Sequence, residues 1–375
     1  MAGLYLHIPF CKQACHYCDF HFSTNLRLKA GVLQAIAEEL SLQRDYLCQA
    51  PLASVYLGGG TPSLLTAPEL ASLLEAVARH FVLPAGIEVT LEANPDDITI
   101  DKLRIWKQLG INRLSIGIQS FQDTVLQAMN RAHNSQEAKR SVELAYQVGF
   151  RNVSIDLMYA TPGLTQAMWE ADLATAMELR PVHIAAYCLT IEPNTAFGRW
   201  HQQGKLRAVQ EEIVVQQFNT LVDTLSAHHY EHYEVASFCQ RGRYAQHNTN
   251  YWKQGSYLGI GPGAHSYNGT TRQHNVRHNA RYIACIQQGT VPCTIEELSH
   301  QDHTNEYIMT SLRTQWGCDL NRLKKHYGYC LQETAKPYLK QLFTQKLVFL
   351  QGSHLVLTQA GKLLADKITA GLFVT

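Results

Sequence analysis

The sequence contains no apolar stretch approaching about 18 residues, so no membrane-spanning helix is expected. It also lacks an excess of either charge, because 32 Lys and Arg residues balance 31 Asp and Glu residues to a formal net charge of +1. This balance argues against nucleic acid or another large polyanion as a partner. The run Met1–His7 lacks the basic segment that opens a signal peptide, and none is predicted.

Hydrophobic residues make up 46% of the 375 residues and charged residues 17%, which is typical of a soluble globular protein with two or three domains. The ten cysteines are unevenly distributed. Three are grouped at Cys11, Cys15 and Cys18, which favours metal binding over disulfides in a chain of this size. The scattered ones are expected to be small buried apolar residues. They are Cys48, Cys188, Cys239, Cys285, Cys293, Cys318 and Cys330.

Short β-branched runs alternate with helix-length amphipathic stretches from residue 4 to about 190, which predicts parallel strands joined by crossover helices. The expected strands are Leu4–Ile8, Ser54–Leu57, Ile87–Glu92, Arg113–Ile118, Asn152–Leu157 and His183–Leu189. The expected helices are Lys29–Leu47, Ala67–Arg79, Asp101–Leu109, Ser135–Val148 and Gln166–Leu179. Such units build an α/β fold, either a doubly wound sheet or an incomplete (β/α)6 barrel, and periodicity alone does not distinguish the two.

Polar residues at or just past the ends of four expected strands favour the barrel. They are the Gly58-Gly59-Gly60-Thr61 turn, Glu92, Gln119 and Asp156. In barrel enzymes the carboxyl ends of the strands face the active site, so convergent polar groups are expected there. The alternative is that each strand simply ends where polar residues resume.

The pattern changes after Thr190. Val209–Ala227 predicts one long helix, and His228–His278 is rich in His, Tyr, Asn and Gly. The chain from about Asp302 is mainly helical. Within it, Lys346–Leu357 predicts a hairpin turning at Gly352-Ser353, and Thr358–Ile368 predicts a following helix. The hairpin and helix suggest a small winged-helix-like tail, which we interpret as a packing module because it carries no basic stripe.

The grouped cysteines have the spacing Cys11-x3-Cys15-x2-Cys18, just after the first expected strand. Thiolates at this spacing can converge on zinc, copper(I) or an iron–sulfur cluster. A structural zinc takes four ligands, and His16 or His21 could supply the fourth. A [4Fe–4S] cluster held by only three cysteines keeps one iron open for a non-protein ligand, and this interpretation leads.

The cysteine spacing resembles that of the radical-SAM superfamily, and Gly58-Gly59-Gly60-Thr61-Pro62 is similar to the glycine motif of the same superfamily. The resemblance implies that the open iron binds the amino and carboxylate groups of S-adenosylmethionine. It also implies that one electron from a donor cleaves this cofactor to a 5′-deoxyadenosyl radical.

Further motifs resemble the HemN branch of that superfamily. They are Tyr5-x-His7-Ile8-Pro9-Phe10-Cys11, Ser115-Ile116-Gly117-Ile118-Gln119-Ser120-Phe121, Asn130-Arg131 and Ile155-Asp156-Leu157. The resemblance implies a set of residues that bind S-adenosylmethionine, with Tyr17 against the adenine. That set is Tyr5, Gly59, Gly60, Thr61, Glu92, Gln119, Arg131 and Asp156.

Two departures separate the sequence from the decarboxylating enzyme of that branch. Phe20 stands where that enzyme has a fourth cysteine, and the chain begins four residues before Tyr5, without an N-terminal extension. Both departures are typical of the HemW haem chaperones. His247-Asn248-Thr249-Asn250-Tyr251-Trp252 resembles the HNxxYW motif of the same group.

The HNxxYW residues His247, Asn248, Tyr251 and Trp252 make chemical sense as a haem site. Imidazole is a common axial ligand of haem iron, and aromatic rings offer flat faces to a porphyrin. The alternative is a satisfied polar network at a domain junction. His265, in the glycine-rich run that follows, is a second candidate ligand.

The resemblance leaves three functions. The first and favoured one is a haem chaperone that transfers haem to acceptor haemoproteins. The second is an oxygen-independent coproporphyrinogen III oxidase, whose decarboxylation is disfavoured by Phe20 and the short N-terminus. The third is a radical-SAM enzyme for another substrate. Under the first, the expected cofactors and cargo are a [4Fe–4S] cluster, S-adenosylmethionine and haem.

The oxygen-labile cluster implies a reducing, cytoplasmic location, with peripheral membrane contact and homodimerisation left open. The expected domains are a radical-SAM partial barrel at residues 1–195, an α+β region on the haem side at 196–295, and a winged-helix-like tail at 296–375.

Overall fold

The computed structural model describes residues 2–374 and is dominated by a twelve-stranded sheet. Six neighbouring strands at its centre follow one another in sequence order and are all parallel. They are β1 (Ala2–Ile8), β2 (Leu52–Gly59), β3 (Glu88–Ala93), β4 (Arg113–Gln119), β5 (Val153–Tyr159) and β6 (His183–Cys188). Each overlaps one of the six strands expected from the sequence.

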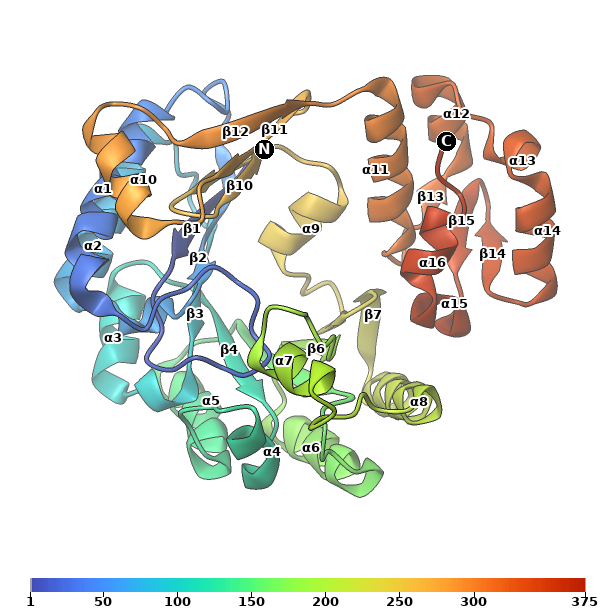
Figure 1. Ribbon diagram of the computed structural model, residues 1–375, viewed down its shortest axis with the longest axis horizontal. Helices are drawn as coiled ribbons and strands as arrows, with labels where there is room; N and C mark the ends of the chain where they lie inside the picture. The colour runs from blue at the N-terminus through green and yellow to red at the C-terminus, as the bar shows by residue number, and fades with distance from the viewer. Residues whose placement is uncertain (1, 375) are drawn as a thin grey trace.

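Helices connect these strands and cover the outer face of the curved sheet (Figure 1). They are α1 (Lys29–Leu42), α2 (Ala67–His80), α3 (Ile100–Gln108), α4 (Asp123–Ala128), α5 (Ser135–Val148) and α6 (Gln166–Leu179), with short 3-10 turns at Leu26–Leu28, Pro62–Leu64 and Pro95–Asp97. Local sequence fixes their ends. Thr66 and Glu69 form a capping box at α2, and Gly149 ends α5 in the left-handed conformation.

Further strands, most of them antiparallel to their neighbours, extend the parallel core at both edges. On one side β9 (Tyr257–Ile260) pairs in parallel with β1 and is followed by β10 (His265–Tyr267), β11 (Thr271–Asn275) and β12 (Cys293–Glu297). On the other side lie β8 (Ser237–Gln240) and β7 (Tyr230–Glu234). Because β1 and β6 each pair outward, the sheet stays open. The sequential strand order and one-sided helices confirm the incomplete barrel over the doubly wound sheet.

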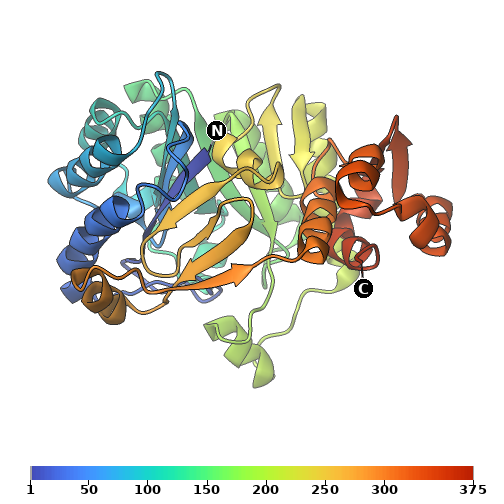
Figure 2. The same cartoon turned by 90° about the horizontal axis from the view of Figure 1, so that it is seen from above.

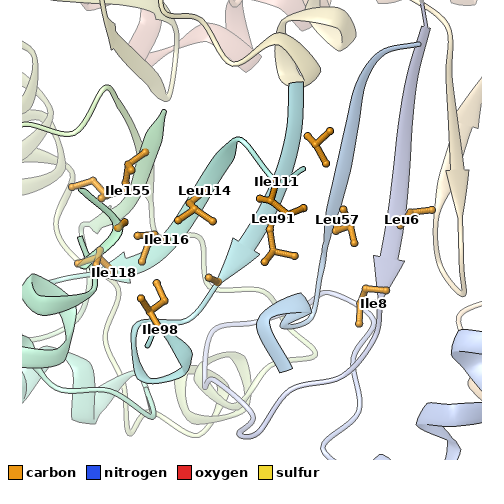
Figure 3. Packing of buried hydrophobic residues seen from close by; sticks show 14 of the residues in the cluster. Leu6, Ile8, Leu57, Leu91, Ile98, Ile111, Leu114, Ile116, Ile118 and Ile155 are labelled. Atoms are coloured by element: carbon orange, nitrogen blue, oxygen red, sulfur yellow. The ribbon is translucent and has the colours of Figure 1, made fainter. Parts of the chain in front are cut away.

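The core lies between the parallel strands and their helices. Leu6, Leu57, Leu91, Leu114 and Ile155 stand in line from one strand to the next (Figure 3). Strands that are buried on both faces consist of nearly continuous apolar residues. This is why the β-branched runs in the sequence predicted the six parallel strands.

The chain between β6 and the C-terminal region adds four helices, among them α9, which lies against β1 and β2. These are α7 (Ala196–Gln202), α8 (Glu211–Ala227), α9 (Gln246–Trp252) and α10 (Asn279–Gln287). Strands from both edges of the sheet come from residues 196–295, the predicted second domain. The domain boundaries themselves stay a prediction.

The C-terminal region has its own apolar core and stands to one side of the barrel (Figures 1 and 2). A three-stranded antiparallel sheet orders β13 (Cys318–Asp319), β15 (His354–Leu357) and β14 (Val348–Gln351), which confirms the predicted hairpin at Gly352. Its helices are α11 (His300–Leu312), α12 (Leu320–Tyr327), α13 (Leu331–Thr334), α14 (Lys336–Thr344), α15 (Gln359–Leu363) and α16 (Ala365–Ala370).

Two helix predictions need correction. The helix expected at Lys29–Leu47 ends at Leu42, because the chain turns there and reaches left-handed backbone at Cys48. The helix expected at Thr358–Ile368 is two helices, α15 and α16, separated at Leu364. No helix within residues 2–374 combines the length and apolarity that a bilayer crossing requires.

Candidate functional site

The three grouped cysteines lie in a loop at the carboxyl end of β1. The loop is closed at its base, where Cys11 N–H donates to Ser23 O at 3.1 Å and Ser23 N–H donates to Pro9 O at 2.9 Å. His16 N–H donates to Met129 O at 3.0 Å, so the loop also reaches the chain that follows α4. All three thiols are free and partly buried, and burial raises the pKa of Cys11 to about 11.

The two histidines near the cysteines have other partners. Nδ1 of His16 lies 2.9 Å from Ala128 O, and Nε2 of His21 lies 2.8 Å from Asn279 Oδ1. Among residues 2–374, no three His, Cys, Asp or Glu side chains converge closely enough to hold a single metal ion. A cubane offers a different iron to each thiolate, so its ligands stand further apart than those of one ion, and this finding concerns a single ion only.

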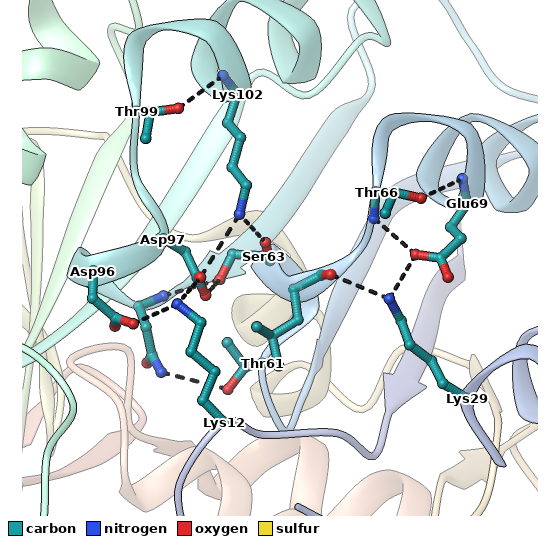
Figure 4. A network of polar contacts seen from close by, with 12 residues as sticks. Lys12, Lys29, Thr61, Ser63, Thr66, Glu69, Asp96, Asp97, Thr99 and Lys102 are labelled. Carbon is teal, nitrogen blue, oxygen red and sulfur yellow. Dashed lines mark hydrogen bonds and ion pairs between the residues drawn. The ribbon is translucent and has the colours of Figure 1, made fainter. Parts of the chain in front are cut away.

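An ion-pair network anchors the cysteine loop to the segment after β3, and the sequence analysis missed it. Figure 4 shows Lys12 between Asp96 and Asp97, with Lys102 reaching the same group. Lys12 Nζ lies 2.6 Å from Asp96 Oδ2. Since Lys12 directly follows Cys11, the network fixes where the loop starts. The run of Asn and Asp after a strand, here Asn94-Pro95-Asp96-Asp97, was the signal that could have found it.

The glycine turn at the end of β2 packs directly under the cysteine loop. Gly60 N–H donates to Ile8 O at 2.9 Å, and Thr61 N–H donates to Phe10 O at 2.7 Å. Gly59 has φ +107°, and a Cβ there would lie 2.6 Å from the ring of His7. A Cβ at Gly60 would lie 2.7 Å from the backbone N of Phe10. Both positions therefore require glycine, because the ring of His7 and the backbone of Phe10 fill the space that a Cβ would need.

Arg131 links the cysteine loop to the barrel. Its Nη1 lies 3.3 Å from Cys15 Sγ and 3.4 Å from Tyr17 OH, while Nη2 donates to Asn94 Oδ1 and Gly117 O, both at 2.8 Å. Its Nε is buried and has no partner among the described residues. Arg131 and Tyr17, both predicted from the sequence, are thus brought together, and Asn94 was missed.

Gln119 ends β4 in a strained conformation beside this group. Its φ is +67°, a backbone angle that residues other than glycine rarely adopt. The side chain is buried, and its Oε1 has no hydrogen-bond partner among the described residues. Strain and an unpartnered buried acceptor are both unusual in a structure, and they coincide with a residue that the sequence predicts to bind a ligand.

Two carboxyl groups stand on neighbouring parts of the barrel interior. Glu92 accepts from Tyr56 OH at 2.8 Å and from Gly59 N–H at 3.1 Å, and burial together with nearby Asp156 raises the pKa of Glu92 to about 7. Asp156 accepts from Ser115 Oγ at 3.3 Å, and burial raises its pKa to about 6. Each carboxylate has spare acceptor capacity in a site of low polarity, which suits hydroxyl or amino donors of a ligand.

Tyr5 faces the same interior from β1. Its OH lies 3.1 Å from Nδ1 of His7, and the other ring nitrogen of His7 lies 2.8 Å from His21 O. The pattern Tyr5-x-His7 thus places both rings on one face of the strand. His7 was quoted in the sequence motif but not assigned a role, and the structure makes it the link between β1 and the cysteine loop.

The HNxxYW residues lie in α9, and His247 is only 2% exposed. Its Nδ1 lies 2.8 Å from Ser54 Oγ and its Nε2 lies 2.6 Å from Tyr251 OH. Burial lowers the pKa of His247 to about 3, so the ring is neutral and both nitrogens are engaged. This geometry fits the satisfied network that the sequence left open as the alternative. Asn248 and Trp252 are half-buried, and Arg313 stacks over the Trp252 ring at 5.2 Å.

Comparisons with known proteins agree with these features. A model of the radical SAM superfamily matches residues 5–176, and one of the HemN C-terminal domain matches residues 298–364. The chain is 33% identical to the heme chaperone HemW of Bacillus subtilis over 98% of both chains. It is also 33% identical to HemW of Escherichia coli, over 98% of this chain and 96% of that one.

A solved structure shares the fold along the whole chain. It is the coproporphyrinogen III oxidase HemN of Escherichia coli, which is a radical SAM enzyme. The TM-score is 0.86 at 20% identity, covering 100% of this chain and 90% of the other. At this identity the likeness establishes a common architecture and leaves the reaction undecided.

Proposed function

The chain belongs to the HemW family of radical-SAM proteins, and from this premise we propose that it binds haem and delivers it to acceptor haemoproteins. The observation that carries the proposal is the relationship over nearly the full length to proteins named heme chaperone HemW. Phe20 supports the proposal, because it occupies the position at which the decarboxylating enzyme of the HemN branch has a fourth cysteine. The Phe20 side chain is 73% exposed.

We propose that Cys11, Cys15 and Cys18 hold a [4Fe–4S] cluster. Its fourth iron binds S-adenosylmethionine, and the pair supplies one-electron chemistry when both are bound. The residues around the cysteines fit this assignment. Among residues 2–374, Arg131 has a buried Nε without a partner and Gln119 has an unpartnered buried oxygen. The backbone N–H of Gly59 reaches Glu92, a carboxylate of the same proposed site.

Each residue of the proposed S-adenosylmethionine site has a physical task. Arg131 places a positive charge 3.3 Å from Cys15 Sγ. Glu92 and Asp156 accept from ribose hydroxyl or amino groups, and Gln119 orients a donor. The site is completed by Tyr5, Gly59, Gly60 and Thr61, with Tyr17 against the adenine.

Tyr251 and Trp252 are proposed to contribute to haem binding through packing. Tyr251 is held by His247 and packs at 4.5 Å, edge to face, on Tyr257. A direct bond from His247 to iron would require its bond to Ser54 or to Tyr251 to break. We therefore propose that His247 positions Tyr251, while Asn248 and Trp252 hold α9 in place. A reducing, cytoplasmic location follows from the oxygen sensitivity of such a cluster and belongs to the same proposal.

The proposal is tested by an anaerobic haem titration of the reconstituted protein, followed through the Soret band. We expect a saturable curve for one site, and transfer of the bound haem to an apo form of a b-type cytochrome. Turnover of coproporphyrinogen without saturable haem binding would overturn it in favour of the enzyme.

The cluster is tested separately. Cys11→Ser, Cys15→Ser and Cys18→Ser are each expected to lose the broad absorbance of the cluster and most of the bound iron, whereas the exposed Cys48→Ser keeps both. A full iron complement in any of the first three variants would contradict the assignment.

A further inference from the structure

Two cavities adjoin over the part of the sheet formed by β1, β9, β10 and β11, and His247 itself lines neither of them. One, of about 480 Å³, is lined by β10, β11 and the start of α10 and β12. The other, of about 300 Å³, is lined by β1, the end of the cysteine loop and the chain around β9. His265 and Arg277 line both, so the two cavities adjoin, and we call them together the edge cleft. Its volume suits a cofactor-sized ligand.

The two halves of the edge cleft have different chemistry. The smaller half is aromatic, with Tyr5, Phe20, Tyr251 and Tyr257 in its lining. Phe20 is 73% exposed, so its ring is accessible to a ligand that enters this half. Flat apolar rings of this kind pack against the face of another flat apolar ring system.

The larger half is cationic. Arg277 and Arg281 line it, and neither makes an ion pair among the described residues. Neither half has an Asp or Glu in its lining. Two guanidinium groups without a counter-charge at the rim of a cleft favour an anionic ligand, and their forked geometry suits carboxylates.

His265 stands between the two halves. It lies directly opposite His274 on the β10–β11 pair, with ring centroids 5.5 Å apart, and it is exposed. Neither of its ring nitrogens is hydrogen-bonded to a described residue, unlike both nitrogens of His7 and His247. Partial burial, together with neighbouring His274 and Arg277, lowers the pKa of His265, which favours the neutral form of imidazole that binds a metal.

We propose that the edge cleft is the haem site, with His265 as the iron ligand and with Arg277 and Arg281 paired to the two propionates. The inference rests on the proposed function and names the site for it. The aromatic half receives the macrocycle, and the cationic half receives the carboxylates that project from one edge. Cys293 also lines the cationic half, but burial raises its pKa, and a neutral thiol is a weak ligand.

The edge cleft also touches the proposed cluster site. Phe20 and His21 follow Cys18 by two and three residues and line the aromatic half. A change in the cysteine loop would therefore move part of the wall that covers the macrocycle. This contact offers a direct physical route by which the occupancy of the radical-SAM site affects the holding and release of haem.

The iron ligand is tested by titrating reconstituted wild type, His265→Ala and the exposed control His326→Ala with haem. We expect His265→Ala to lose the absorption and EPR features of an imidazole-bound iron and to regain them with added imidazole, while His326→Ala behaves as wild type. Loss of the imidazole features in His274→Ala or His247→Ala, with His265→Ala unchanged, overturns the assignment.

The propionate contacts are tested by comparing haem with its dimethyl ester. Wild type is expected to bind haem about tenfold more tightly than the ester or better, and Arg277→Ala/Arg281→Ala to bind the two alike. The exposed Arg241→Ala keeps the preference. If the double variant prefers haem over the ester as strongly as wild type does, the cationic half is not the propionate site. Wild type that binds neither ligand overturns the proposed function itself, so the two failures are distinguishable.

Discussion

The backbone N–H of Gly59 donates to Oε2 of Glu92 across 3.1 Å, which joins the ends of β2 and β3 at the candidate site. Tyr56 donates to the other carboxylate oxygen of Glu92 at 2.8 Å. These two donors only partly offset the burial of the carboxylate, whose pKa is raised to about 7. The ionised carboxylate of Glu92 therefore destabilises the ligand-free fold, and it lies where the proposed ligand donates hydrogen bonds.

Glu92→Gln is expected to stabilise the ligand-free protein at pH 8 and to do so less at pH 6. Because the folded-state pKa lies above the unfolded value of 4.5, protonation of Glu92 favours the fold at low pH, and this contribution is lost as the pH rises through about 7. Glutamine carries no charge at either pH. The gain in unfolding free energy at pH 8, measured by urea denaturation, is on the order of 2 kcal/mol.

The same variant is expected to bind S-adenosylmethionine about tenfold more weakly, because a neutral amide is the poorer acceptor. The exposed Glu75→Gln is the control, since it removes the same charge from the surface and should leave both quantities unchanged. A Glu92→Gln protein that is destabilised equally at both pH values would show that the carboxylate is not strained by burial.

Gly59→Ala is expected to prevent cluster assembly, whereas Gly110→Ala is not. Both glycines have positive φ, at +107° and +89°, so both substitutions cost about 1 kcal/mol in backbone strain. Only at Gly59 would the new methyl group also meet the His7 ring, at 2.6 Å. That contact displaces His7 and, through its bond to His21 O, the end of the cysteine loop.

Iron content after anaerobic reconstitution and the unfolding free energy are the two measurements for this pair. Equal iron content in the two variants would mean that the glycine turn does not support the cysteine loop. A lower iron content and a larger loss of stability in Gly59→Ala than in Gly110→Ala are the expected results.

The strand pattern and the motifs predicted the barrel and many of the residues that the structure gathers at one end of it. Parallel strands end at a common edge, so polar residues at strand ends, such as Glu92 and Asp156, converge without any knowledge of side-chain geometry. The antiparallel strands at both edges of the sheet escaped prediction. Their residues, such as those of β10 and β11, are few and largely polar, which gives no clear alternation.

The role of His247 could not be predicted from the sequence, because a motif names residue types but not the partners of each nitrogen. Only the structure shows that Ser54, far away in the chain, occupies Nδ1. The same limit applies to Lys12, whose partners Asp96 and Asp97 lie in another loop. Long-range pairs of this kind depend on the strand order, which the periodicity left open.

His247→Ala is expected to weaken haem binding several-fold while leaving the imidazole features of the bound iron intact. The substitution leaves Ser54 and Tyr251 without their buried partner, at a cost of about 2 kcal/mol in unfolding free energy. Haem affinity falls because Tyr251 is no longer held in the wall of the edge cleft. Tyr251→Phe is the matched variant, because it removes the hydrogen bond between His247 and Tyr251 but keeps both rings. Its affinity for haem should lie between that of wild type and that of His247→Ala. Complete loss of the imidazole features in His247→Ala would return the ligand role to this residue.

Phe20→Cys separates the chaperone from the decarboxylase most directly, because it changes the position at which the resembled enzyme has its fourth cysteine. We expect the variant to bind haem several-fold more weakly, since an exposed aromatic wall of the edge cleft is lost. Phe20→Tyr keeps a ring there and should bind haem as wild type does. Neither variant is expected to convert coproporphyrinogen to a decarboxylated product under anaerobic turnover conditions, as measured by chromatography of the oxidised porphyrins. Such a product from Phe20→Cys would show that a single side chain separates the two functions, and would place the substrate of that reaction in the edge cleft.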